Sequence, residues 1–431
     1  MSVARWGLVA AVAVAASVAL FASTIPLGLL SDDYVLLSLP VLPGSRWPFL
    51  RPLPMLVWKV VHPLTGAVGL HVLNVLLHGV NTALVFRLAG RLAPDGPRVV
   101  GALAALTFLT SPVAVEPIAW AAGIFDTALV TCALAYLLTL LAPWGRVWTV
   151  AAAVAWLAAA LATKETAVAL PALGALLALR ATVSWPAVAA SVVVAGGYAA
   201  LRAVGLDLSI GVVSAHYRLD GVVFESFGAL GRPWLWAASP SPARLLVPLG
   251  YLALLMGYAW ARGNWRPLST AAWVVAGAAP VLGFAVGPDL AGSRYVYLPL
   301  VGWSLLLAEL AWRQPAGLAR RLAVGFVVAV AAAGAVAGQH RARAWTNAAA
   351  LRDRVVVGAR AVLEASPCPK VVLLGAPDSL DGAYVFRHGL ALATEGEAPT
   401  RIVRAADASA SEACTFVWRD DRFVPAGAPP G

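Results

Sequence analysis

The chain has 431 residues, of which 61% are hydrophobic and only 12% are charged, and its formal net charge is +10. Soluble domains carry about 25% charged residues, so this composition excludes an ordinary soluble protein. Lipid admits only helices or closed barrels, and the hydrophobic runs are far longer than barrel strands. We therefore predict an all-α, polytopic membrane protein.

The positive charges lie at the ends of the hydrophobic runs and do not form one basic patch. Nearly all of them are arginines, because the only lysines are Lys59, Lys164 and Lys370. Arginine and lysine gather in the short cytoplasmic turns of membrane proteins, so this distribution indicates topology signals. We expect membrane lipid as a partner and no nucleic acid.

The first hydrophobic run, residues 6–30, follows Arg5 and is too long for the apolar core of a cleaved signal peptide. We predict an uncleaved first helix with a cytoplasmic N-terminus. An outer loop at 31–66 follows, which begins with the acidic stretch Ser31-Asp32-Asp33-Tyr34. Arg51 opens a short segment within this loop, whose mixture of tryptophan, basic and apolar residues predicts an interfacial helix.

Further apolar runs bring the total to about eleven predicted spans. They cover residues 70–88, 99–109, 121–141, 147–161, 167–179, 185–201, 245–260, 268–286, 295–312 and 322–338. In this assignment every inner turn carries arginine, as cytoplasmic turns should. The more polar stretch 205–242 is assigned to an outer loop with a non-spanning segment, because a full span there would invert the later turns.

Beyond residue 340 the composition becomes that of a soluble domain. Helices are predicted at 345–364 and 381–393, and strands at 370–375, 400–405 and 414–419. We therefore expect a transmembrane part, 1–340, followed by a small extracytoplasmic α/β tail, 341–431. Cys368 and Cys414 lie beside predicted strands, so they form either a disulfide or two separate buried thiols.

Polar groups at membrane depth carry the functional information, because a charge at the centre of the bilayer costs about 2.5–3.5 kcal/mol. Almost all of the candidates lie at the outer ends of predicted spans. They are Asp32, Asp33, Arg51, His71, Asn74, Glu116, Asp126, Lys164, Glu165, Glu225 and Arg294. This asymmetry predicts a site that faces the outside of the membrane.

The second predicted span has one polar face. Its members fall within about 80° of one another on a helix of 100° per residue. They are His71, Asn74, His78 and Asn81. These side chains either line a cavity for a polar substrate or form hydrogen bonds between helices. The two histidines are two turns apart, too far for one metal ion without further ligands, so no metal site is expected.

Asp32 and Asp33 are either a solvated helix cap or a general base that accepts the proton of an attacking hydroxyl, amine or amide. The negative charges of two adjacent carboxylates repel each other, so both cannot keep an ordinary pKa without a cost in free energy. We therefore expect the two side chains to have different roles. Arg51 and Arg294 either anchor the chain at the interface or clamp a lipid-linked phosphate. Lys164 either forms a local ion pair with its neighbour Glu165 or belongs to the same phosphate site.

Several short stretches stand out together by their order and spacing. They are Asp32-Asp33-Tyr34, Arg51-Pro52-Leu53, His71-Val72-Leu73-Asn74 with His78, Ser111-Pro112 through Glu116, Asp126, Lys164-Glu165 and Arg294-Tyr295-Val296-Tyr297-Leu298-Pro299. Over residues 5–340 this pattern resembles the GT-C class of membrane glycosyltransferases. Within the class, it is most similar to bacterial relatives of protein O-mannosyltransferases and to the transmembrane/TPR cadherin O-mannosyltransferases. The chain departs from the latter in lacking TPR repeats, which leaves the acceptor open.

The resemblance implies that a sugar moves from a polyprenyl-phosphate donor to a protein, glycan or lipid acceptor at the outer face of the cytoplasmic membrane. Asp33 or Asp32 would be the catalytic base, and Glu116 and Asp126 would be acidic groups of the outer site. No cofactor is implied with certainty, and the participation of a divalent cation stays open.

The same resemblance places basic groups against the donor phosphate, namely Arg294 with Arg51 or Lys164. Other members of the matching stretches would line the cavity. They are His71, Asn74, His78, Glu165 and Tyr295.

Other classes of membrane protein give alternative interpretations. A secondary transporter should show inverted repeats and broken helices in two matching halves, and the sequence shows no such symmetry. An O-antigen ligase or polymerase-like enzyme, which also uses lipid-linked glycans, would gather basic and histidine residues in one large outer loop. Residues 205–242 are a modest version of such a loop. An inactive scaffold whose tail binds a partner is the remaining alternative.

Overall fold

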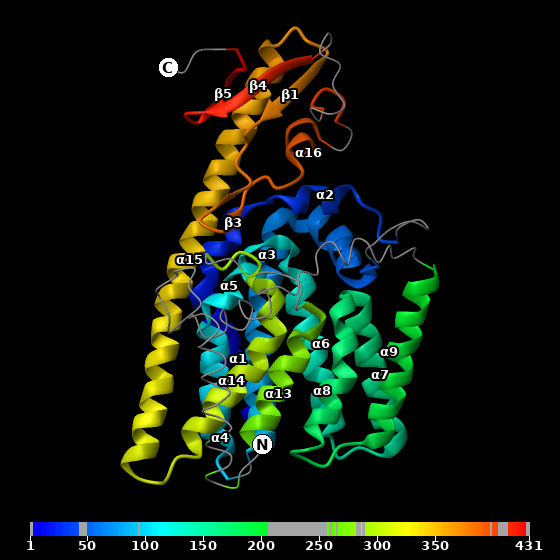
Figure 1. The fold of residues 1–431 in the computed structure, drawn as a ribbon, viewed down its shortest axis with the longest axis vertical. Helices are drawn as coiled ribbons and strands as arrows, with labels where there is room; N and C mark the ends of the chain where they lie inside the picture. Colours follow the sequence, from blue (N-terminus) through cyan, green and yellow to red (C-terminus); the bar gives the residue numbers. More distant parts are fainter. Residues whose placement is uncertain are drawn as a thin grey trace.

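The computed structural model describes residues 3–42, 50–93, 95–205, 257, 261, 263, 266–281, 286, 289–396, 399–403 and 413–427. Within these residues the chain forms a bundle of helices, and a small α/β tail lies beyond one end of it (Figure 1). We call this end of the bundle the tail end. The predicted fold class, a polytopic helical membrane protein with a small C-terminal tail containing strands, is confirmed.

The helices Pro52–Leu92 and Leu318–Ala365 extend well beyond the spans predicted at 70–88 and 322–338, and Val115–Ala119 matches no predicted span. The described helices of the bundle otherwise overlap the predicted spans. They are α1 (Val3–Phe21), α3 (Pro52–Leu92), α4 (Pro97–Thr110), α5 (Val115–Ala119), α6 (Ile124–Leu140), α7 (Arg146–Thr163), α8 (Leu170–Leu177), α9 (Trp185–Gly205), α13 (Arg266–Ala278), α14 (Tyr297–Trp312) and α15 (Leu318–Ala365). Among the described residues, six helices are long and apolar enough to cross a membrane, or seven if one bent pair counts as a span. Most of the predicted span 245–260, and the loop 205–242 beyond residue 205, lie outside the described residues.

The bent pair joins α4 to α5 across Ser111 and Pro112, with a bend of 52°. Proline has no backbone N–H and cannot continue a helix, so the chain turns here. Every residue of 111–127 is buried, which places this broken segment in the middle of the tail end. Backbone groups released by such a break need partners, because lipid supplies none.

The tail begins inside a helix. α15 continues without a break from the membrane part to Ala365, so its residues 345–364 are helical as predicted. The sheet then has the order β1 (Lys370–Leu374), β4 (Ala413–Arg419) and β5 (Arg422–Pro425), with β1 and β4 parallel and β4 and β5 antiparallel. The predicted strand at 400–405 is reduced, in its described part, to an isolated bridge between Val371 and Ile402.

The helix predicted at 381–393 is wrong over most of its length. Residues 379–384 form a hairpin of β2 (Ser379–Leu380) and β3 (Ala383–Tyr384), and only α16 (Leu390–Glu395) is helical. The turn residues Asp381 and Gly382 have φ angles of 47° and 74°. Asp-Gly is a strong signal for a two-residue hairpin turn, and here it overrides the apolar periodicity.

Cys368 and Cys414 form a disulfide, with their Cα atoms 5.8 Å apart. The bond ties the residues before β1 to β4, where Cys414 pairs with Val371. The sequence alone did not distinguish this disulfide from two separate buried thiols.

We expect this disulfide to be detected as a cross-linked peptide by mass spectrometry of the protein digested without reductant. Cys368→Ser should lower the stability of the tail by about 4 kcal/mol, because the bond closes a long loop in the unfolded chain. Proteolysis of the tail with and without reductant measures this loss. Alkylation of both thiols in the unreduced, unfolded protein would contradict the prediction.

Candidate active site

Asp33 lies in the first turn of α2 (Asp32–Ser38) and has no exposed surface. Its Oδ2 accepts a hydrogen bond from the N–H of Leu30 at 2.8 Å, and its Oδ1 accepts one from the N–H of Ala122 at 3.0 Å. The side chain thus joins the first loop to the broken segment. Burial raises the pKa of the Asp33 carboxyl well above its usual range, although the two backbone hydrogen bonds oppose the shift.

Asp32 differs from its neighbour in position and exposure. Its side chain is half-buried, and its Oδ1 accepts a hydrogen bond from the Ser31 hydroxyl at 3.3 Å. The two adjacent carboxylates therefore occupy unlike environments, one enclosed by protein and one at the surface.

Glu116 of α5 is completely buried. It forms an ion pair with Arg294, which lies in the short 3-10 helix Ser293–Val296. The Ser293 hydroxyl lies 3.3 Å from the second oxygen of Glu116. The phenol of Tyr384, a residue of the tail, donates to Glu116 at 3.1 Å.

Three aromatic rings surround the Arg294 guanidinium. Its central carbon lies 4.8, 4.5 and 5.4 Å from the ring centres of Trp120, Tyr295 and Tyr384. The face of an aromatic ring attracts a cation within about 6 Å. Trp120 also donates its indole N–H to the Leu30 carbonyl at 3.2 Å, so it joins the Arg294 pair to the loop that holds Asp33.

A second ion pair continues from the first. Lys164 and Asp126 are both buried, and the Lys164 ammonium lies 2.5 Å from the Asp126 carboxylate. The same ammonium lies 5.5 Å from the ring centre of Tyr295. Tyr295 therefore lies between the cations Arg294 and Lys164.

A third ion pair lies at the more exposed end of this series. Arg51 donates two hydrogen bonds to Glu165, at 2.9 and 2.5 Å. Arg202 of α9 comes within 3.9 Å of the same carboxylate. The side chains of Arg51 and Glu165 are 19% and 34% exposed, compared with 15% and 0% for Arg294 and Glu116.

The structure thus brings six of the predicted site residues together as three neighbouring ion pairs at the tail end. We call them the charged row: Glu116 with Arg294, Asp126 with Lys164, and Glu165 with Arg51. Sequence reasoning missed Trp120, Arg202, Ser293 and Tyr384. Arg202 carried a usable signal, since it follows the seventh predicted span at its outer end.

The polar face of α3 packs inside the bundle. His71 Nε2 lies 2.9 Å from the Gly28 carbonyl, and the Asn74 amide donates to the Trp120 carbonyl at 2.8 Å. His78 Nδ1 lies 2.7 Å from the Tyr297 hydroxyl. All three side chains are completely buried, as is Asn81. In this structure they hold neighbouring helices together, and Asn74 binds a carbonyl of the broken segment.

In the described part of the chain, no three or more His, Cys, Asp or Glu residues are arranged to hold a metal ion.

Comparisons with known proteins identify the fold. No known protein-family profile and no curated protein sequence matches the chain. The solved structure of ArnT from Cupriavidus metallidurans, bound to undecaprenyl phosphate, superimposes with a TM-score of 0.53 over 100% of both chains. The two chains share a fold. Their sequences are 14% identical, so the similarity concerns the fold alone, which is the GT-C-like fold that the sequence predicts.

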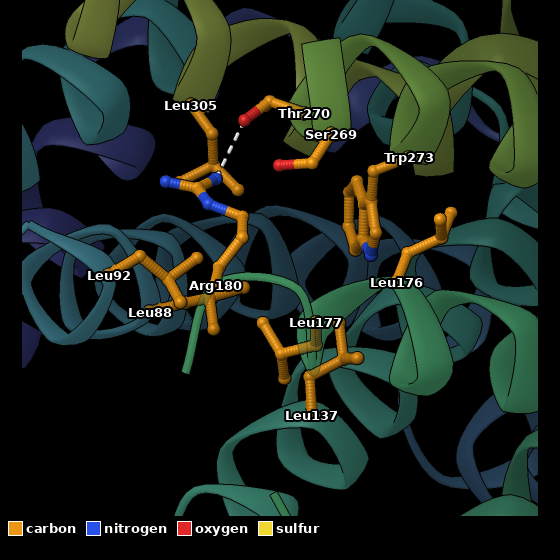
Figure 2. Close-up of a pocket in the computed structure, with 10 residues that line it drawn as sticks. All are labelled: Leu88, Leu92, Leu137, Leu176, Leu177, Arg180, Ser269, Thr270, Trp273 and Leu305. Atoms are coloured by element: carbon orange, nitrogen blue, oxygen red, sulfur yellow. Dashed lines mark hydrogen bonds between the residues drawn. The ribbon is translucent and has the colours of Figure 1, made fainter. Parts of the chain in front are cut away.

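The opposite end of the bundle contains a small cavity lined mostly by leucines, with Arg180, Ser269, Thr270 and Trp273 (Figure 2). Its volume of about 10 Å³ is at the lower limit of the space that a single water molecule needs, far too small for a sugar. Arg180 reaches the Thr270 hydroxyl at 2.6 Å and forms a buried ion pair with Glu309. Thr270 in turn donates to Glu309 at 3.0 Å.

The Arg180–Glu309 pair allows a test of packing that is separate from the candidate active site. Glu309→Leu leaves a buried guanidinium without its carboxylate and should cost about 3–5 kcal/mol of stability. The double variant Arg180→Leu/Glu309→Leu should recover most of the loss, because no charge then stays buried. Thermal unfolding in detergent measures both effects, and strictly additive losses would contradict this account.

Proposed function

We propose that the protein is a glycosyltransferase that moves a sugar from a polyprenyl-phosphate donor to an acceptor on the extracytoplasmic side of the membrane. The observation that carries the proposal is the charged row at the tail end, which Trp120 and the broken segment join to the buried carboxylate of Asp33. The shared fold supports it, because ArnT was solved with undecaprenyl phosphate bound. The sequence resemblance favours a hexose such as mannose as the transferred sugar.

Two observations support the proposed orientation of the tail. The disulfide between Cys368 and Cys414 is typical of an oxidising compartment, which favours a tail outside the cytoplasm. The arginine-rich turns lie at the opposite end of the bundle, as cytoplasmic turns should. We therefore place the N-terminus in the cytoplasm, and the charged row at the outer face of the cytoplasmic membrane.

The proposed reaction is a single displacement with inversion. Asp33 accepts the proton of the acceptor's hydroxyl, amine or amide, while the acceptor atom forms a bond with the anomeric carbon of the sugar. The bond between that carbon and the phosphate oxygen breaks, and polyprenyl phosphate leaves with the electron pair. Burial favours Asp33 over Asp32 as the base, because it raises the proton affinity of the carboxylate.

The departing phosphate gains negative charge, and guanidinium groups bind such an oxyanion well. Arg51 and Arg202 both approach the single carboxylate of Glu165, and this end of the charged row is its more exposed end. We propose that the donor phosphate reaches the row there, with Arg294 and Lys164 further inside. Glu116 and Asp126 would keep those two cations in place.

Asp33→Asn should lower the rate of sugar transfer at least about 100-fold, because the amide cannot accept the proton. Asp32→Asn, a matched change at the neighbouring half-buried position, should keep most of the activity. The assay is the release of polyprenyl phosphate from a labelled donor by purified protein. The thermal stability of both variants is measured alongside, since Asp33 also binds two backbone N–H groups. Near-normal transfer by both variants would overturn the proposal.

The pH profile gives a second test. Asp33 acts only when ionised, so transfer should be lost as the pH falls through its raised pKa, well above the usual aspartate value of about 3.9. A carboxyl with a raised folded pKa stabilises the folded state in acid, and this contribution is lost as the pH rises. Activity at moderately acidic pH should therefore fall while the folded protein persists. An acid limb near pH 4 would contradict a buried base.

The alternatives give different results in the same experiments. A secondary transporter would move a solute across vesicles without consuming any polyprenyl-phosphate sugar. A ligase-like enzyme would consume a lipid-linked glycan but would transfer no single sugar. Both outcomes would replace the proposal.

A further inference from the structure

Residues 378–389 of the tail, which we call the strap, lie against the candidate active site. They contain the hairpin of β2 and β3 and the turn that leads to α16. Four consecutive strap residues, 383–386, are at most 5% exposed. Trp345 of α15 and Trp120 both pack edge-on against the ring of Tyr384, and the first loop contacts the next residue, Val385.

The strap is fixed on both sides of Tyr384. Arg341 of α15 donates to the carbonyls of Asp381 and Gly382, the latter at 2.9 Å. One residue after Tyr384, the Val385 carbonyl accepts a hydrogen bond from the N–H of Ser31 at 3.0 Å. The segment is therefore held from the last helix and from the first loop at once.

The hairpin turn itself has little room to move. At Gly382, where φ is +74°, an added Cβ would lie 2.6 Å from Asp289 Cγ and 2.8 Å from Arg341 Nη1. At Gly389, where φ is +84°, it would lie 2.8 Å from the Ser31 carbonyl oxygen. Such close contacts on two sides indicate a docked segment.

The phenol of Tyr384 bridges the first ion pair of the charged row. Its oxygen accepts from Arg294 Nη1 at 2.6 Å and donates to Glu116 at 3.1 Å. Burial, and after it the charge of Glu116, raises the pKa of the Tyr384 phenol above its usual range. The hydroxyl therefore keeps its proton at physiological pH and can act as donor and acceptor at the same time.

We propose that Tyr384 is a positioning residue that sets the orientation of the Arg294 guanidinium, so that the tail completes the candidate active site. With Nη1 held by Glu116 and Tyr384, the other terminal nitrogen, Nη2, donates to the Tyr295 hydroxyl at 3.0 Å, on the side of Lys164. This inference rests on the proposed function for its effect on transfer. The orientation of the Arg294 guanidinium by Tyr384 does not depend on the proposed function.

The test compares Tyr384→Phe with Phe386→Leu in the full-length protein. Phe386 stacks on Tyr34 with ring centres 6.0 Å apart, so its truncation loosens the strap without removing a hydrogen bond from the charged row. Tyr384→Phe removes only the hydroxyl. It should lower kcat for sugar transfer about 10- to 100-fold, as expected for the loss of hydrogen bonds to charged groups, with little change in the KM of the acceptor. Phe386→Leu should lower the Tm yet keep kcat within about threefold.

Hydrogen–deuterium exchange supplies a readout that needs no activity. Tyr384→Phe should increase exchange in peptides covering 115–119 and 293–296 and leave the strap protected. Unchanged exchange there, or a loss of kcat that merely follows the loss of Tm in both variants, would overturn the inference. If the wild-type protein transfers no sugar from any donor, the proposed function fails, and the exchange experiment still decides the role of Tyr384.

Discussion

The burial of one carboxylate, Glu116, determines how the tail end is assembled. An ionised carboxylate without partners in a low-dielectric interior costs far more than a folded protein can tolerate. Glu116 therefore needs a cation and hydrogen-bond donors, and the chain supplies them from distant segments. Arg294 and Ser293 come from the 3-10 helix before α14, and Tyr384 comes from the tail. This one requirement brings together the broken segment, the last third of the bundle and the strap.

The broken segment imposes the second condition. Its turns expose backbone groups at a depth where neither water nor a helix ladder satisfies them. Asp33 accepts a hydrogen bond from the N–H of Ala122, and the Asn74 amide donates one to the carbonyl of Trp120. Asp33 thus binds the same broken segment that carries Glu116 of the charged row. The contacts that satisfy the backbone of the broken segment are therefore also the contacts that hold the proposed base.

Much of the architecture could be predicted from the sequence, because long apolar runs and arginine-rich turns are local signals. The gathering of polar groups at the ends of spans was visible for the same reason. The pairing within the charged row could not be predicted, because Glu116 and Arg294 are 178 residues apart and no local sequence pattern connects them. For the polar face of α3, a cavity wall and a helix contact have the same periodicity, so the sequence left both open.

The tail was predicted less well than the bundle. Apolar spacing predicted a helix at 381–393, while the Asp381-Gly382 turn and its contacts with Arg341 produce a hairpin. Tyr384 carried no signal that could distinguish it from any buried aromatic residue. Its importance comes entirely from where the hairpin docks, and docking of a short strap onto a distant ion pair is a property of the whole fold.

The hydrogen bond between Ser31 and Val385 joins the beginning of the chain to nearly its end. Chains are synthesised from the N-terminus, so the early helices can enter the membrane long before residue 384 leaves the ribosome. Until then, Glu116 and Arg294 lack the phenol that bridges them in the finished protein. A chain that is truncated before the strap therefore contains the helices of the bundle but lacks the phenol that bridges the first ion pair of the charged row. Biosynthesis itself thus orders the events, with insertion first and completion of the site last.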